Sequence, residues 1–141
     1  MDKIIIDAKD CILGRLGVEV SKLTRLNYEV IILNCEKIVI SGSKKTILNH
    51  YLERLHRGST ESGPRQSKRP DRFVRRAIRA MFEYKGFLGK TAFGRVKTFI
   101  GIPDEYSDKI SKDFKCKKSS DLIHNKYIVV GDLCKQLGGK W

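Results

Sequence analysis

Short apolar runs alternate along the chain with segments of helical periodicity, and this alternation constrains the fold more than any other feature. Five runs have the β-branched composition of strands: KIIID, EVIIL, KIVIS, VKTFI and KYIVV. Four of them contain an uninterrupted stretch of three or four apolar residues, which is typical of strands buried on both faces. Between the first two runs, apolar residues recur at the spacing of one helix face: Leu13, Leu16, Val20 and Leu23. The pattern predicts one α/β domain over residues 1–141, with a mostly parallel sheet and helices on both faces.

Two further segments complete this outline. A helix is expected after GSKK, and its buried stripe consists of Ile47, Leu48, Tyr51, Leu52 and Leu55. Residues 57–69, RGSTESGPRQSKR, lack any periodicity and are rich in Gly, Ser and basic residues, which indicates a basic loop. The stretch between this helix and the VKTFI run is an insertion that a simple alternation of strands and helices does not need.

Positive charge is concentrated in that insertion. The chain has 29 Lys and Arg against 16 Asp and Glu, a net charge of +13. Residues 54–97 carry 13 basic and 3 acidic side chains, whereas residues 1–53 carry 8 and 7 and residues 98–141 carry 8 and 6. Such a balance predicts a polyanionic partner, with nucleic acid favoured over an anionic membrane surface. Residues 54–97 are therefore the predicted binding region.

Within this region, the segment RPDRFVRRAIRAMF (residues 69–82) predicts an amphipathic helix. Its four arginines, at i, i+3, i+4 and i+7, fall on one helix face: Arg72, Arg75, Arg76 and Arg79. The opposite face is apolar and consists of Phe73, Val74, Ala77, Ile78 and Met81. A solvated helix would usually alternate glutamates with its arginines, and a membrane helix would carry apolar residues beside its basic face. An apolar side turned directly away from the arginines suits a protein core, with the arginines on RNA phosphates.

Other basic side chains extend the predicted RNA contact. Those that flank the arginine helix in the sequence are Arg65, Lys68, Arg69, Lys85, Lys90, Arg95 and Lys97. His56 lies between Arg54 and Arg57 and is better suited to a phosphate contact than to general-base catalysis. Lys44 and Lys45, the two lysines of GSKK, lie at the N-terminus of the expected helix, where they either hold one phosphate group or form a solvated pair.

A small nucleotide-using α/β enzyme is the competing interpretation. The segment DAKDCILGRLG runs from a strand into a helix, but of the dinucleotide-binding glycines it has only Gly14 and Gly17. We interpret these two glycines as allowing close packing of the helix on the sheet. ISGSKKT lacks the two glycines of a Walker A loop, so it offers no triphosphate cradle. No catalytic set of side chains stands out, and we predict neither an enzyme nor a cofactor.

The cysteines indicate a reducing compartment. Cys11, Cys35 and Cys134 have apolar neighbours and are expected to be buried, whereas Cys116 lies among lysines and is expected to be exposed. None forms a CxxC pair, so a disulfide and a zinc site are both unexpected. No apolar run has the length of a membrane span. We therefore expect a cytoplasmic protein with no membrane partner.

Five motifs in series resemble the L-thirteen family of universal large-subunit ribosomal proteins. They are IIIDAKDCILGRLGVEVSKL, VIILNCEKIVISG, GP…KRPDRFVRRAIRAMF, LGKTAFGRVKTFIG and YIVVGDLCKQLGG. The resemblance covers nearly the whole chain, with residues 103–125 the least similar. It implies a three-layer, Rossmann-like α/β domain without a cofactor or small-molecule substrate. It also implies binding to large-subunit rRNA beside neighbouring ribosomal proteins, and a role in early subunit assembly.

The resemblance also carries over to particular positions. The implied RNA surface comprises the helix arginines and Arg65, Lys68, Arg69, Lys85, Lys90 and Arg95. Ala80 and Glu83 replace the Gly and Pro of the family pattern, which would allow the arginine helix to run further. The chain ends at Trp141, soon after LGGK, without the long basic extension of eukaryotic members. In this respect it resembles archaeal members.

Overall fold

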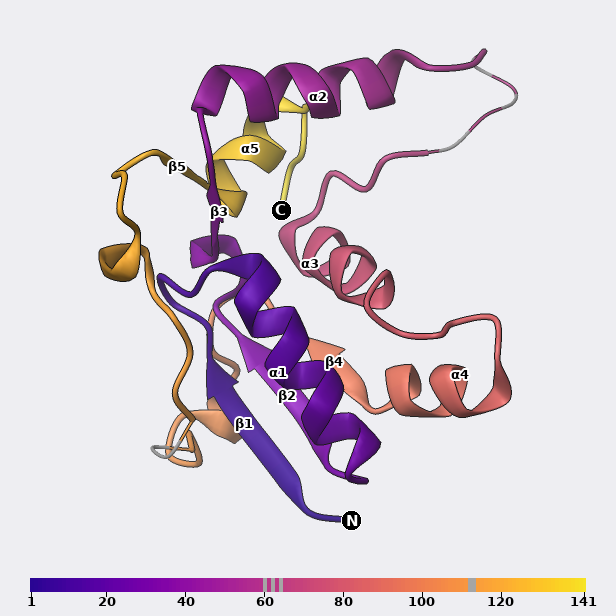
Figure 1. Ribbon diagram of the computed structural model, residues 1–141, viewed down its shortest axis with the longest axis vertical. Helices are drawn as coiled ribbons and strands as arrows, with labels where there is room; N and C mark the ends of the chain where they lie inside the picture. The colour runs from indigo at the N-terminus through magenta and orange to yellow at the C-terminus, as the bar shows by residue number, and fades with distance from the viewer. Residues whose placement is uncertain (60, 62, 64, 112–113) are drawn as a thin grey trace.

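The computed structural model describes residues 1–59, 61, 63, 65–111 and 114–141 (Figure 1). Thr60, Ser62 and Pro64 of the predicted basic loop, and residues 112–113, lie outside the described residues. The strands are β1 (Lys3–Asp7), β2 (Glu29–Leu33), β3 (Val39–Ser41), β4 (Val96–Thr98) and β5 (Tyr127–Val129). The α-helices are α1 (Leu13–Arg25), α2 (Lys44–His56), α3 (Pro70–Arg79), α4 (Phe87–Gly94) and α5 (Val130–Gln136). Three 3₁₀ helices join them: η1 (Cys35–Lys37), η2 (Asp104–Tyr106) and η3 (Ser119–Asp121).

The main sheet is parallel, as predicted, and has the strand order β1-β2-β4. Ile4 pairs with Val30, and Val30 pairs with Val96 on its other side. Because side chains alternate across a strand, β2 directs Val30 and Ile32 to one face and Ile31 and Leu33 to the other. All four side chains are fully buried, which confirms that this apolar run is covered on both faces.

Among the described residues, α-helices cover only one face of this sheet. The larger core lies there, where Leu16 of α1, Ile78 of α3 and Ala92 of α4 pack with Ile32. On the other face, Ile31 is covered by Phe99, Tyr106 and Ile110, which belong to η2 and to irregular chain on either side of it. The prediction of α-helices on both faces was therefore wrong for the described part of this sheet. Three apolar side chains from η2 and the irregular chain around it bury this face in place of an α-helix.

The second sheet also departs from the prediction of a single, mostly parallel sheet. β3 and β5 form an antiparallel pair in which Val39 lies opposite Val129. Asn34, with a left-handed φ of 56°, and the 3₁₀ turn η1 redirect the chain after β2. β3 consequently does not add to the main sheet but pairs with the strand that leads into α5. Mixed α/β architecture is confirmed, with two small sheets where one was expected.

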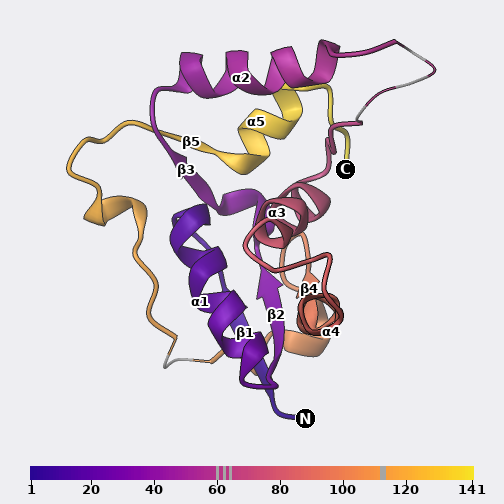
Figure 2. The same ribbon diagram turned by 45° about the vertical axis from the view of Figure 1, so that its right-hand side comes forward.

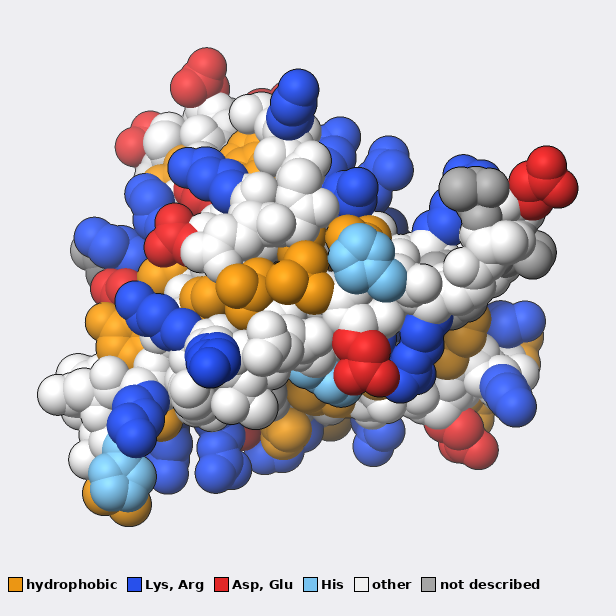
Figure 3. Space-filling model, turned by 90° about the horizontal axis from the view of Figure 1, so that it is seen from above, with side chains coloured by type: hydrophobic (Ala, Val, Ile, Leu, Met, Phe, Trp, Pro, Cys, Tyr) orange, Lys and Arg blue, Asp and Glu red, His pale blue; other side chains and the backbone are white. Residues whose placement is uncertain are grey.

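Helix α2 covers the second sheet and α5, at the top of the molecule in Figures 1 and 2. Its predicted apolar stripe is present, but all five side chains are only half-buried. Ile47, Leu48, Tyr51 and Leu52 pack against the main core from its edge. In Figure 3, which looks down on this end of the molecule, apolar side chains are visible among Lys and Arg side chains.

The packing tests what was predicted for the glycines of α1 and for the cysteines. A methyl group on Gly17 would collide with the side chain of Met81, so this glycine allows α1 to lie close to the end of α3 rather than to the sheet. A methyl group on Gly14 would meet no atom within 4 Å, so the prediction that Gly14 allows close packing on the sheet was wrong. Cys11, Cys35 and Cys134 are buried, as predicted. Cys116 is half-buried and packs against the core, so the expectation that it would be exposed was wrong. Its lysine neighbours point to solvent while the chain here runs along residues 10–12.

Candidate nucleic-acid interface

Helix α3 is amphipathic in the way that its sequence predicts. It begins at Pro70, which is pre-organised for the first helical turn, and Asp71 complements the helix dipole there. Phe73, Val74 and Ile78 are buried against the sheet and α1. The helix ends at Arg79, so the expected continuation past Ala80 does not occur. The opposite side is the arginine face, which consists of Arg72, Arg75, Arg76 and Arg79.

The arginine face lines a groove of about 790 Å³, here called the first groove. The chain that enters α3 forms one side of it, and the C-terminal segment forms another. The basic side chains that line it are Arg65, Lys68, Arg69, Arg72, Arg75, Arg76, Arg79 and Lys140. Lys140 was not among the predicted RNA contacts, because it lies 61 residues after Arg79 in the sequence. Its place in the LGGK motif was the one available signal.

A second groove, of about 670 Å³, lies between α2 and α3. Arg54 and Tyr51 of α2 line it together with Lys85. Arg76 and Arg79 line both grooves and therefore form the ridge between them. The structure thus brings two predicted contacts outside α3, Arg54 and Lys85, beside the arginine face.

Two of these arginines are stacked on aromatic rings. The guanidinium carbon of Arg75 lies 5.0 Å from the centre of the Phe93 ring, and that of Arg79 lies 5.0 Å from the centre of the Tyr84 ring. The two rings meet edge to face, with centroids 5.6 Å apart. These four residues, here called the arginine–aromatic cluster, hold both guanidinium groups by cation–π attraction. The rings leave the in-plane N–H groups available to donate hydrogen bonds.

Two other predicted RNA contacts, Arg95 and Lys97, already interact with groups of the protein itself. Arg95 donates a hydrogen bond from Nη1 to the Thr24 carbonyl, 2.9 Å away, near the C-terminus of α1. Lys97 forms an ion pair with Glu29. The hydrogen bond from Lys97 lowers the pKa of the Glu29 carboxyl, and Lys3 lowers it further. The same hydrogen bond to Glu29 raises the pKa of Lys97.

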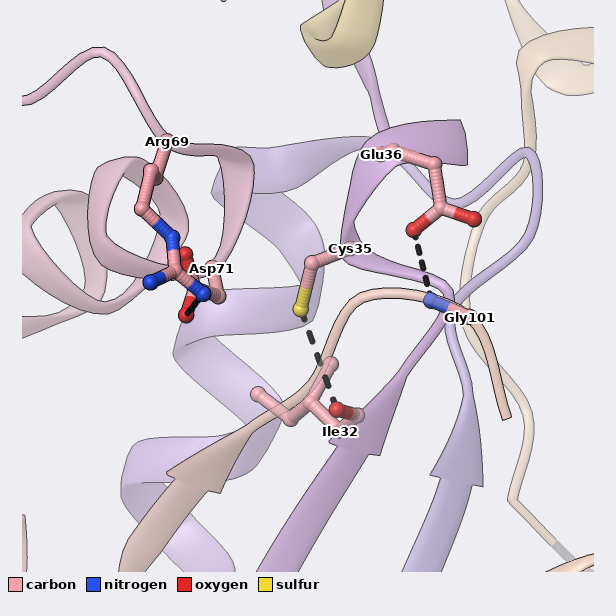
Figure 4. A network of polar contacts seen from close by, with 6 residues as sticks. All are labelled: Ile32, Cys35, Glu36, Arg69, Asp71 and Gly101. Carbon is pink, nitrogen blue, oxygen red and sulfur yellow. Dashed lines mark hydrogen bonds and ion pairs between the residues drawn. The ribbon is translucent and has the colours of Figure 1, made fainter. Parts of the chain in front are cut away.

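The entrance to α3 contains a further set of polar contacts (Figure 4). Arg69 lies 3.2 Å from Oδ2 of Asp71, while Oδ1 of Asp71 is buried without a hydrogen-bond partner among the described residues. Nearby, burial raises the pKa of the Cys35 thiol to about 12, so this cysteine stays protonated and unreactive. Arg76 donates to the Arg65 carbonyl and so ties the chain before α3 to the arginine face.

The remaining predicted contacts lie along α2. Lys44 and Lys45 open the helix, and His56 and Arg57 lie at its far end, so the two pairs are separated by its length. Arg57 forms an exposed ion pair with Glu53. Lys90, on α4, is exposed. Neither groove described above is lined by Lys44, Lys45, His56, Arg57 or Lys90.

Metal binding and membrane insertion also find no support in the described part of the chain. No group of three or more His, Cys, Asp or Glu side chains there could hold a metal ion. None of the described helices is both long enough and apolar enough to cross a membrane.

Comparison with known proteins gives one consistent result. The family described as Ribosomal protein L13 matches residues 1–105. The chain is 42% identical over 137 residues to the large ribosomal subunit protein uL13 of Methanococcoides burtonii, covering 97% of this chain and 99% of the relative. It is 42% identical over 138 residues to the protein of that name from Methanosarcina barkeri, with coverage of 97% and 99%. For the Methanocaldococcus jannaschii protein, identity is 38% over 141 residues, with coverage of 97% and 98%. These archaeal relatives confirm the resemblance that the motifs carry: the chain belongs to the ribosomal protein L13 family.

Proposed function

We propose that this protein is a structural constituent of the large ribosomal subunit and binds large-subunit rRNA through the arginine face of α3. The observation that carries this proposal is the division of α3 into a buried apolar side and an arginine side that lines two grooves. Arg72, Arg75 and Arg79 form no hydrogen bond or ion pair with any described residue, so their donors remain available for phosphate oxygens. The relatives are themselves named as large-subunit proteins.

The wider RNA surface follows from the same geometry. Arg54, Arg65, Lys68, Lys85 and Lys140 extend the arginine face along the two grooves. Arg57, His56, Lys90 and the Lys44–Lys45 pair would meet phosphates further away, on the exposed surface of α2 and α4. Arg95 and Lys97 contribute less, because each already has a protein partner. A nucleotide-using enzyme gains no support from the family to which the chain belongs.

Assembly and neighbours belong to this proposal as well. Several segments of the chain build one extended basic surface. Such a surface suits the binding of an rRNA junction whose strands come together early in subunit assembly. The neighbouring ribosomal proteins in this proposal are inferred from the names of the relatives, which are large-subunit proteins. The protein would then reside in the large ribosomal subunit, in the cytoplasm.

Sedimentation of cell lysates tests the proposal. The test variant replaces the four residues of the arginine face with Gln, and a matched control replaces Lys9, Lys109, Lys115 and Lys126, which are exposed and remote in sequence from α3. Both variants lose four positive charges. We expect the wild-type protein and the control to sediment with the large subunit and the test variant to remain at the top of the gradient. Equal sedimentation of the two variants would contradict a specific role for the arginine face.

A further inference from the structure

The arginine–aromatic cluster is more elaborate than phosphate binding requires. A phosphate oxygen needs only the N–H edge of a guanidinium group, and the exposed Arg72 offers that without any ring beside it. Arg75 and Arg79 instead lie over Phe93 and Tyr84, each with 5.0 Å between guanidinium carbon and ring centre. The buried ring of Phe82 lies next to Phe93, with 5.6 Å between their centroids, and so connects the cluster to the core.

This arrangement fixes two flat cationic groups at the protein surface. Arg75 and Arg79 are one turn apart on α3, where two like charges repel each other. The electron-rich faces of the rings offset this repulsion and restrict the rotamers of both arginines. Arg75 is exposed and Tyr84 is 41% exposed, so the cluster keeps planar surface that a ligand can reach. Phe93 lines the first groove, and Tyr84 lines the second.

We infer that the arginine–aromatic cluster binds unpaired nucleotides of the rRNA, whose bases stack on the planar groups of the cluster. This inference rests on the proposed function and specifies which RNA structure the site recognises. Bases in an A-form helix bury their faces in the stack, whereas bulged and looped bases expose them and stack on aromatic rings or guanidinium planes. The first groove, at about 790 Å³, falls within the range of about 300–1,000 Å³ usual for small-ligand sites, so it can admit a base.

The chemistry around the cluster favours a nucleotide over an apolar peptide. Arg76 and Arg79 form the ridge between the grooves, and Lys140 and Lys85 line the grooves on either side of it. An unpaired nucleotide matches both the planar groups of the cluster and the cations around it. Its base faces the planar groups while its phosphates face these cations.

Two RNA duplexes with equal numbers of nucleotides test the inference. One contains a three-nucleotide bulge and the other is fully paired, so that both carry similar charge. We expect the wild-type protein to bind the bulged duplex about fivefold more tightly or better, which is the contribution expected from stacking one base. With 2-aminopurine in the bulge, its fluorescence should change on binding. Tyr84→Leu and Phe93→Leu should each lower affinity for the bulged duplex more than affinity for the paired duplex, so that the ratio of the two affinities falls.

Controls separate this inference from the proposed function. Arg72→Gln removes a charge without touching a ring and should weaken both duplexes alike. Tyr84 is partly exposed, so Tyr84→Leu keeps the test valid if Phe93→Leu, which alters the core, fails to fold. If the wild-type protein binds both duplexes equally well, or if the ring variants weaken both alike, the inference is wrong and the proposed function stands. If the wild-type protein binds neither duplex, both fail.

Discussion

At the scale of single residues, Arg95 shows that a basic side chain in the binding region can serve the fold. Its guanidinium donates to the Thr24 carbonyl near the C-terminus of α1, where a cation is favourable. Arg95→Gln should therefore lower the free energy of unfolding by about 1–2 kcal/mol. It should weaken RNA binding less than Arg75→Gln does. Thermal unfolding and RNA titration measure the two effects. The matched control is Lys90→Gln, at an exposed site, which should change stability by less than about 0.5 kcal/mol. Equal stability of the two variants would contradict this role.

Lys97 and Glu29 form the second residue-scale test. The hydrogen bond from Lys97 lowers the pKa of Glu29 below its ordinary value of 4.5. A lowered carboxyl pKa adds stability above about pH 4.5, and this stability is lost as pH falls through the folded-state pKa. Lys97→Gln should raise the pKa of Glu29 and flatten the loss of stability in acid. Carboxyl NMR titration would show this, with Lys90→Gln as a control that leaves Glu29 unchanged. An unmoved Glu29 pKa in Lys97→Gln would show that the ion pair is not maintained in solution.

At the scale of elements, we expect the apolar side of α3 to stabilise the fold and its arginine face to bind RNA. Ile78 is fully buried on its apolar side, so Ile78→Asp should destabilise the protein by about 3–5 kcal/mol because it buries an unpaired charge. Ile78→Val removes one methylene and should cost about 0.5–1.5 kcal/mol. Replacing all four residues of the arginine face with Gln should shift the thermal midpoint by only a few degrees. Unfolding of this last variant at ambient temperature would show that the arginine face stabilises the fold.

Individual helices could be predicted from the sequence, whereas the pairing of strands could not. The periodicity of Leu13, Leu16 and Val20 predicted α1, and the arginine spacing predicted α3, because each pattern is local. The antiparallel pairing of β3 with β5 was missed, since an apolar strand does not specify its partner and η1 redirects the chain. The stacking of Arg75 on Phe93 joins residues 18 positions apart, so it depends on the turns between α3 and α4.

At the scale of the whole molecule, basic side chains that are concentrated in one part of the sequence also lie close together in the structure. Residues 54–97 carry 13 basic and 3 acidic side chains, and α3 at their centre is anchored in the larger core. Arg54 of α2 and Lys140 near the C-terminus join the arginine face from distant parts of the chain. The main sheet and its helices thus form a packed support that presents one cationic surface. We expect this surface to contact many RNA phosphates at once.

The salt dependence of RNA binding measures how many phosphates this surface contacts. Titrations of a cognate rRNA fragment at several potassium concentrations give the slope of log K against log salt. Contact with about six to ten phosphates predicts a slope of about −4 to −9, because each contact releases a fraction of a counterion. The variant with Gln at all four positions of the arginine face should have a slope shallower by about 3 units, whereas the lysine control retains the wild-type slope. A wild-type slope shallower than about −2 would contradict the account, since it would mean that few phosphates are contacted and that the charge serves solubility instead.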